Sequence, residues 1–176
     1  MDLWGKLLKQ AYSFATNSND PSTQNGALVV AINGTHSNAD TPYRVLAGDY
    51  NRFPKGVTET PERWNDRALK YKLVQHAERS ALETARRLNG LAHLDGHTMI
   101  CPWAACTDCA KSIIDSGLTR LVTHKQAAER SPPSSSWLPD IEVANMMLRE
   151  AGIEIICYDG PVGALPVRHS GQVWTP

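Results

Sequence analysis

The chain has 176 residues, of which 41% are hydrophobic and 20% charged, a composition that suits one globular domain over residues 1–176. Its 18 basic and 18 acidic residues cancel. This balance argues against a groove that follows the phosphates of a long nucleic acid, although a neutral total still allows a local basic patch. We expect a cytoplasmic protein with no disulfide framework, signal peptide or transmembrane span.

The first half of the chain is predicted to contain one helix and two strands. Apolar residues recur at helical spacing over residues 2–16, and turn-forming residues follow them. A β-branched apolar run at residues 27–32 predicts a strand, and residues 43–47 predict its partner after a polar loop at 35–42. Residues 48–75 form a long insertion with little regular pattern, which is typical of a functional loop.

The second half is predicted to alternate helices with strands. The expected helices cover residues 76–89, 106–116 and 137–151, and the expected strands cover residues 98–101, 120–123 and 153–157. The first of these helices would bury one side formed by Ala77, Ala81, Ala85 and Leu88. A loop is expected at 131–136, and the tail from Asp159 is expected along the surface. This alternation indicates an α/β sandwich with a mixed sheet.

One histidine and two cysteines have the spacing of a metal site. His76 precedes Cys106 by thirty residues, and Cys106 and Cys109 are three residues apart, so both thiolates can lie on one helix face. Three protein ligands leave the fourth tetrahedral position of Zn²⁺ open for water, whose pKa the metal lowers to about 7. Both metal-binding segments are expected to follow strands and to begin helices. A helix N-terminus also stabilises thiolates.

A carboxylate lies two residues beyond the histidine. His76 and Glu78 do not share a helix face, so Glu78 is a poor fourth ligand but can reach a metal-bound water from a first helical turn. The pattern H-x-E…P-C-x-x-C is the signature of zinc nucleobase deaminases. The chain departs from it at Ala105, where the signature has proline, and this change removes no ligand.

Two other interpretations of the cysteines remain open. A C-x-x-C pair is also typical of redox sites and of structural zinc sites. A structural site would need a fourth ligand, for which the candidates are His93, His97, Cys101 and His124. Cys101 and Cys157 lie in apolar runs and are otherwise expected to be buried free thiols.

Nearly the whole chain resembles the deoxycytidylate (dCMP) deaminase family, within the wider cytidine deaminase-like fold. Beside the metal motif, the resemblance rests on the segments at residues 20–27, 50–56, 69–71, 106–114 and 147–153. The metal motif alone fits any zinc nucleobase deaminase, whereas the Asn51 loop and the long insertion point to dCMP. Asn25 and Ser80 depart from the family, which usually has valine and asparagine there.

The resemblance implies a three-layer sandwich with a five-stranded sheet and hydrolytic deamination of dCMP to dUMP and ammonia. Glu78 would act as general base and then acid, and His76, Cys106 and Cys109 would hold the zinc. The remaining substrate contacts that it suggests are the backbone around Ala77 and Ala105 for the base, Asn51 for the sugar, and Ser22 and Thr23 for the 5′-phosphate.

Family members are often hexamers that dCTP activates and dTTP inhibits, as complexes with Mg²⁺. The resemblance therefore implies a second nucleotide site. Since a triphosphate needs positive charge near a glycine-rich loop, its candidate cations are Arg52, Lys55 and Arg87. Asp49 is a further candidate residue of this site.

Three alternative functions remain. A deaminase of free cytosine or cytidine would use the same metal motif. A deaminase of a base within nucleic acid would also need a basic aromatic channel, which the neutral charge disfavours. A zinc-stabilised nucleotide-binding regulatory protein without activity would be suggested by loss of the carboxylate, yet Glu78 is present.

Overall fold

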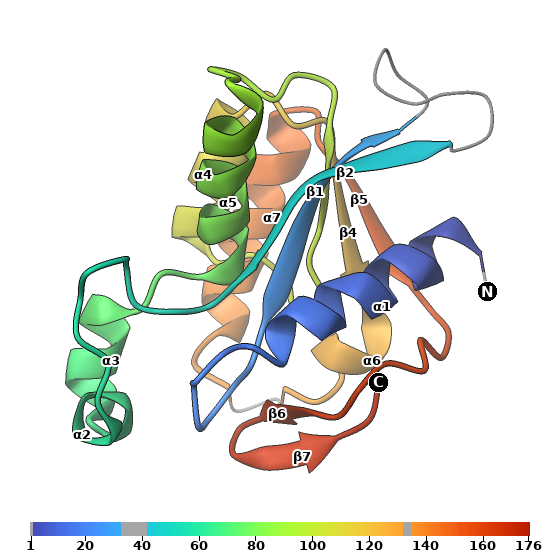
Figure 1. Ribbon diagram of the computed structural model, residues 1–176. Helices are drawn as coiled ribbons and strands as arrows, with labels where there is room; N and C mark the ends of the chain where they lie inside the picture. The colour runs from blue at the N-terminus through green and yellow to red at the C-terminus, as the bar shows by residue number, and fades with distance from the viewer. Residues whose placement is uncertain (1, 33–41, 132–134) are drawn as a thin grey trace.

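The computed structural model describes residues 2–32, 42–131 and 135–176 and has three layers (Figure 1). The middle layer is a five-stranded sheet in the order β2-β1-β3-β4-β5. β1 pairs antiparallel with β2 and β3, whereas β3, β4 and β5 run parallel, so the predicted mixed sheet is confirmed. The strands are β1 (Gly26–Ile32), β2 (Tyr43–Tyr50), β3 (Thr98–Ile100), β4 (Arg120–His124) and β5 (Glu154–Tyr158).

Helices cover both faces of this sheet. Alternate strand residues face opposite layers, as the period of two requires: Val29 and Met99 pack in one cluster, and Leu28 and Ile100 in the other. Helix α1 lies on the second face, and three helices lie together on the first (Figure 1). These helices are α1 (Leu3–Ala15) and, opposite, α4 (Ala77–Asn89), α5 (Thr107–Asp115) and α7 (Leu138–Glu150).

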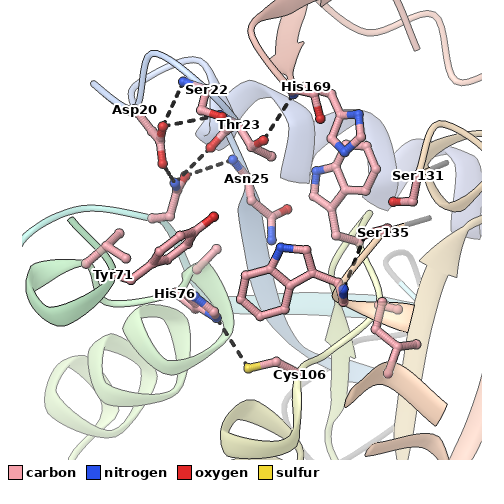
Figure 2. A pocket seen from close by; sticks show the side chains of 18 of the residues that line it. Asp20, Ser22, Thr23, Asn25, Tyr71, His76, Cys106, Ser131, Ser135 and His169 are labelled. Atoms are coloured by element: carbon pink, nitrogen blue, oxygen red, sulfur yellow. Dashed lines mark hydrogen bonds between the residues drawn. The ribbon is translucent and has the colours of Figure 1, made fainter. Parts of the chain in front are cut away.

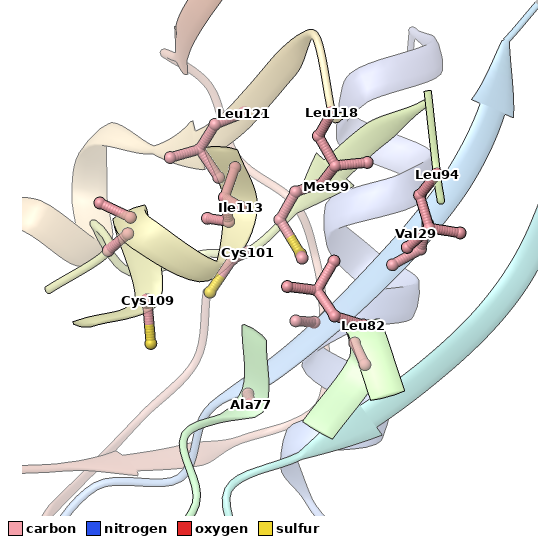
Figure 3. Packing of buried hydrophobic residues seen from close by; sticks show 14 of the residues in the cluster. Val29, Ala77, Leu82, Leu94, Met99, Cys101, Cys109, Ile113, Leu118 and Leu121 are labelled. Atoms are coloured by element: carbon pink, nitrogen blue, oxygen red, sulfur yellow. The ribbon is translucent and has the colours of Figure 1, made fainter. Parts of the chain in front are cut away.

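The core on the three-helix face sets the positions of α4 and α5. Figure 3 shows Leu82 of α4 and Ile113 of α5 packed around Met99 at the centre of the sheet. Ala77, the first residue of α4, is fully buried, as is Cys109 in the first turn of α5. The starts of both helices are therefore anchored in one hydrophobic core.

The insertion at residues 48–75 is more regular than the sequence pattern indicated. It contains the end of β2 and two short helices, α2 (Pro61–Asn65) and α3 (Arg67–Leu73). The Thr60 side chain caps α2, and that of Asp66 caps α3. Phe53 stacks on buried Trp64 with ring centroids 4.1 Å apart. The insertion is thus an ordered unit with a small core of its own.

The first metal-binding segment was predicted to follow a strand, and this is wrong. His76 follows α3, and only an isolated bridge between Arg52 and Gln75 precedes it. The prediction that His76 and Cys106 begin helices is confirmed, since each is the N-cap residue of its helix.

Other departures lie at the surface and in the tail. Leu88, expected on the buried side of α4, is 62% exposed, and Cys157 is exposed because β5 is the edge strand. Cys101 is buried, as predicted. Three elements were not predicted: α6 (Lys125–Ala128), β6 (Val167–His169) and β7 (Gln172–Trp174). The loop predicted at 35–42 falls almost wholly outside the described residues, as does part of the loop at 131–136.

The tail is fixed to the body by a buried histidine. The Tyr12 hydroxyl of α1 lies 2.7 Å from Nδ1 of His124, and Nε2 of His124 lies 3.0 Å from the carbonyl oxygen of Gly160. Burial lowers the pKa of His124. A neutral ring can donate to Gly160 and accept from Tyr12, and so joins α1, β4 and the tail. No helix in the described residues is long and apolar enough to cross a membrane.

We expect the Tyr12→Phe variant to lose about 1–3 kcal/mol of unfolding free energy in urea titrations, because buried Nδ1 of His124 loses the hydroxyl that bonds to it. Tyr50→Phe is the matched control, since Tyr50 is half-buried and its hydroxyl makes no hydrogen bond within the described residues. Equal stability of the two variants would contradict this role for His124.

Candidate active site

His76, Cys106 and Cys109 meet at the N-termini of two helices. Sγ of Cys106 lies 3.4 Å from Nδ1 of His76, and Sγ of Cys109 lies 3.5 Å from the same nitrogen. All three possible ligand atoms lie within 4.8 Å of one another. Within the described residues this is the one group of histidine, cysteine and acidic side chains close enough to hold a metal.

The geometry of this group fits tetrahedral zinc. With bonds of about 2.3 Å to sulfur and about 2.05 Å to nitrogen, a tetrahedral angle separates the two ligand atoms by about 3.6 Å. The observed separations of 3.4 and 3.5 Å are close to this value. One imidazole and two thiolates also match zinc in donor type.

The fourth ligand that a structural zinc site would need is missing from this group. Of the four candidates, His124 is bonded to Tyr12 and Gly160, and the Nδ1 atom of His97 contacts the Leu94 and Asp95 carbonyl oxygens. Cys101 lies beside the Asn25 side chain, and His93 is absent from the group. Three ligands with a fourth position open are typical of a catalytic site.

The electrostatics of the group favour metal binding. The hydrogen bond from Cys109 and the neighbouring His76 lower the pKa of Cys106 to about 4. The hydrogen bond between His76 and this thiolate raises the pKa of His76 to about 9. The hydrogen bond that Cys109 donates to Cys106 raises the pKa of Cys109. The site therefore holds a thiolate near neutral pH, and a cation of higher charge can displace the remaining protons.

Glu78 lies in the first turn of α4, beside the metal group. It is only 2% exposed, yet it lines a cavity of about 490 Å³, and its Oε2 atom has no hydrogen-bond partner in the described residues. Burial raises its pKa. A buried carboxyl group without an ion pair, facing a cavity, is suited to exchange protons with a bound molecule.

The cavity brings together segments that are far apart in the sequence. Figure 2 shows His76 and Cys106 on one side, the Asp20–Asn25 loop on another, and His169 from the C-terminal tail. Of the predicted site residues it is lined by Ser22, Thr23, Asn51, His76, Ala77, Glu78 and Cys106. Cys109 and Ala105 lie in the core beside it, where Ala105 is 1% exposed and Ala104 forms the wall instead.

Asn51 is engaged in holding the neighbouring loop. Its Oδ1 atom accepts from the backbone N–H of Asn25, and its Nδ2 atom donates to the Thr23 carbonyl oxygen and to Asp20. Asn51 is 6% exposed at the cavity wall. The predicted contact with a sugar is not tested by these bonds, but they give Asn51 a clear positioning role.

Lys70 is the most informative residue that sequence reasoning missed. Its ammonium lies 3.1 and 3.2 Å from the two carboxylate oxygens of Asp20, with both residues buried. Asp20 also accepts from the backbone N–H groups of Ser22 and Thr23. The pair thus joins the insertion to the loop that carries two predicted phosphate contacts. An aspartate in a run of turn-forming residues gave no signal for a partner 50 positions away.

Aromatic residues at the cavity were also missed. The Trp137 ring makes edge contacts with Tyr71 and His76, at centroid distances of 5.8 and 6.2 Å. Trp103 stacks on His169 at 4.2 Å. Flat rings on two walls are suited to a planar ligand.

The candidate residues for a second nucleotide site lie away from this cavity. Arg52 forms a two-bond ion pair with Asp49, which also accepts from the Thr84 hydroxyl. The hydrogen bonds that Arg52 donates to the Asp49 carboxylate raise the pKa of Arg52. Lys55 and Arg87 are exposed. None of the four lines the cavity among the described residues.

Residues 3–125, well over half of the chain, match the family described as "Cytidine and deoxycytidylate deaminase zinc-binding region". The chain belongs to this family. The zinc-binding region named in the family's description includes His76, Cys106 and Cys109 within its matched range and supports zinc as the metal of this group.

Two curated relatives are similar in sequence. The "uncharacterized deaminase in luxG 3'region" of Aliivibrio fischeri is 28% identical over 153 residues, which cover 86% of this chain and 91% of that protein. The deoxycytidylate deaminase of Mus musculus is 29% identical over 117 residues, which cover 64% of this chain and 58% of the mouse protein.

Solved structures show the same fold. The apo dCMP deaminase of cyanophage S-TIM5 has a TM-score of 0.57 at 21% identity, covering 90% of this chain and all of that one. The Rib2 deaminase of Aspergillus oryzae has a TM-score of 0.61 at 16% identity, covering 90% of this chain and 86% of that one. These likenesses confirm the cytidine deaminase-like sandwich.

We expect the purified protein to contain about one zinc ion per chain, measured by mass spectrometry of the metal, and Cys109→Ser to weaken zinc binding by at least about tenfold. Cys157→Ser is the matched control, because Cys157 is exposed and lies outside the metal group. Full zinc content in Cys109→Ser would contradict the ligand assignment.

Proposed function

We propose that this protein hydrolytically deaminates dCMP to dUMP and ammonia, with zinc held by His76, Cys106 and Cys109. One observation carries the proposal: a buried Glu78 carboxyl with an unbonded oxygen lies beside a three-ligand zinc group, at the wall of a cavity. This combination provides a Lewis acid site, a proton carrier and space for a substrate.

The proposed mechanism divides the work among residues of this chain. Zinc, when bound, would lower the pKa of a water molecule so that hydroxide, which can attack the base, is available at neutral pH. Glu78 would take a proton from this water while the water oxygen bonds to C4 of cytosine. Glu78 would then pass that proton to N3. The remaining proton of the new C4 hydroxyl, also carried by Glu78, would go to the amino group, which leaves as ammonia when the C4–N bond breaks and the C4 carbonyl forms.

The cavity suits a small planar substrate with an anionic group. Trp137 and Trp103 present rings on two of its walls, and the wall formed by α3 carries the cations Arg67 and Lys70. Lys70 is neutralised by Asp20, whereas Arg67 forms no ion pair with the described residues. A net positive wall favours a nucleotide over the free base or nucleoside.

Two finer parts of the proposal rest on the resemblance to the dCMP deaminase family. They are activation by dCTP and inhibition by dTTP, each with Mg²⁺, at a second site that includes Asp49, Arg52, Lys55 and Arg87. The mouse relative bears the name deoxycytidylate deaminase, which supports dCMP as the substrate. The hexamer and the cytoplasmic location stay predictions.

We expect zinc-loaded protein to decrease the ultraviolet absorbance of dCMP faster than that of CMP, deoxycytidine or cytosine. Added dCTP with Mg²⁺ should raise the rate on dCMP, and dTTP should lower it. Turnover of only the unphosphorylated substrates would remove dCMP as the substrate while leaving the zinc chemistry in place. Turnover of none would direct the search to bases within nucleic acid.

We expect Glu78→Gln to retain its zinc and its circular dichroism spectrum while its turnover falls by about 10²–10⁴-fold, because an amide cannot carry the protons. Glu83→Gln is the matched control on the same helix, since Glu83 is exposed and does not line the cavity. Undiminished turnover by Glu78→Gln would exclude the mechanism.

A further inference from the structure

The C-terminal hairpin contributes to the wall of the active-site cavity. Its strands β6 and β7 are joined by the two-residue turn Ser170-Gly171, with His169 and Gln172 paired at its base. His169 and Ser170 both line the cavity. The hairpin lies beyond residue 125, where the match to the family ends, so the family match says nothing about its role.

Four hydrogen bonds attach this hairpin to the loop at residues 22–24. The Arg168 carbonyl oxygen accepts from the backbone N–H of Gln24, and the Arg168 N–H donates to the Gln24 side chain. At the turn, the N–H of Ser170 donates to the Thr23 hydroxyl, and that of Gly171 donates to the Ser22 carbonyl oxygen. These bonds hold the turn beside Ser22 and Thr23.

Aromatic contacts fix the other side of the hairpin. His169 stacks on Trp103, which lies three residues before the metal-binding Cys106. Trp174 makes edge contact with Tyr12 and stacks on His124, the residue that anchors the tail. The hairpin is thus positioned against both the loop at residues 22–24 and Trp103, in the segment that leads to Cys106.

The backbone at the tip is strained. Ser170 has φ of 51°, and it is the one non-glycine residue with positive φ among the described residues. Turns with positive φ at both central positions strongly favour Asn-Gly or Gly-Gly, because other side chains clash with the backbone. Strained residues of this kind cluster at functional sites, where the side chain is needed.

Ser170 lines the cavity together with two other residues that carry hydroxyls, Ser22 and Thr23. The oxygen atoms of the Ser22 and Ser170 hydroxyls make no hydrogen bond within the described chain, and the Thr23 oxygen accepts from Ser170 and so keeps its own proton to donate. The nearby Asp20 carboxylate is already bonded to Lys70, Asn51 and two backbone N–H groups. Three hydroxyl donors beside a neutralised carboxylate are suited to bind an anion.

We propose that Ser170, together with Ser22 and Thr23, binds the 5′-phosphate of the substrate, and that Ser170 determines the preference for a phosphorylated substrate. This inference rests on the proposed deaminase function and adds a specificity-determining residue from the hairpin. Arg67 on the α3 wall of the same cavity forms no ion pair with the described residues and favours an anion there, whereas Lys70 neutralises Asp20.

The Ser170→Gly variant separates function from structure. Glycine keeps the N–H bond to Thr23 and relieves the positive φ, so we expect the melting temperature to rise by about 2 °C. The loss of the hydroxyl should raise KM for dCMP and lower kcat/KM about tenfold, with kcat little changed. The kcat/KM for deoxycytidine should not change. A residue with a purely structural role would give a more stable enzyme without this selective loss.

Gln172→Ala is the matched control, because Gln172 is exposed on the same hairpin and does not line the cavity. It should leave the ratio of kcat/KM for dCMP to that for deoxycytidine unchanged. An unchanged ratio in Ser170→Gly, or equal losses on both substrates, would overturn the phosphate assignment.

Calorimetric binding makes failure of this inference distinguishable from failure of the proposed function. Affinities for dCMP and deoxycytidine are measured in the Glu78→Gln background with and without Ser170→Gly. If the wild-type protein deaminates neither compound but Ser170→Gly selectively weakens dCMP binding, the proposed function fails and the phosphate assignment stands. If Ser170→Gly leaves the preference for dCMP intact, the assignment fails whether or not the wild type deaminates dCMP.

Discussion

The structure depends on one constraint: the N-termini of α4 and α5 must meet at a single point. His76 and Cys106 are the N-cap residues of these helices, and Cys109 lies one turn into α5. Unpaired N–H groups at a helix start stabilise thiolates. Fully buried Ala77 and Cys109 anchor both starts in the core over the central strands. The hydrophobic packing on this face of the sheet therefore determines the metal geometry.

A second, polar constraint shapes the cavity around this point. The Asp20–Lys70 pair is buried, and breaking one partner of such a pair leaves an uncompensated charge. Asn51 completes the network with bonds to Asp20, Thr23 and Asn25. The insertion that looked irregular in the sequence thus has a physical purpose: α3 brings Lys70, Tyr71 and Arg67 to the cavity wall.

The sequence predicted the metal group and the alternation of helices and strands, because both depend on local spacing. The C-x-x-C pair and the H-x-E pair each lie within one helix start, and apolar periodicity marks the long helices. Helices α2 and α3, with five and seven residues, are too short for periodicity to show, although Thr60-Pro61 and Asp66 are capping signals. Lys70 and Ser170 were missed because their partners lie 50 and 147 positions away.

The residues proposed for the chemistry lie in the segment that matches the family, whereas part of the cavity wall comes from residues beyond it. The metal group and Glu78 fall within residues 3–125, the part that matches the family. Trp137, His169 and Ser170 line the same cavity from outside that part. The fold itself does not discriminate, since a dCMP deaminase and a Rib2 deaminase resemble this chain with TM-scores of 0.57 and 0.61. We therefore expect substrate choice to depend on the cavity walls, to which the insertion and the C-terminal hairpin both contribute residues.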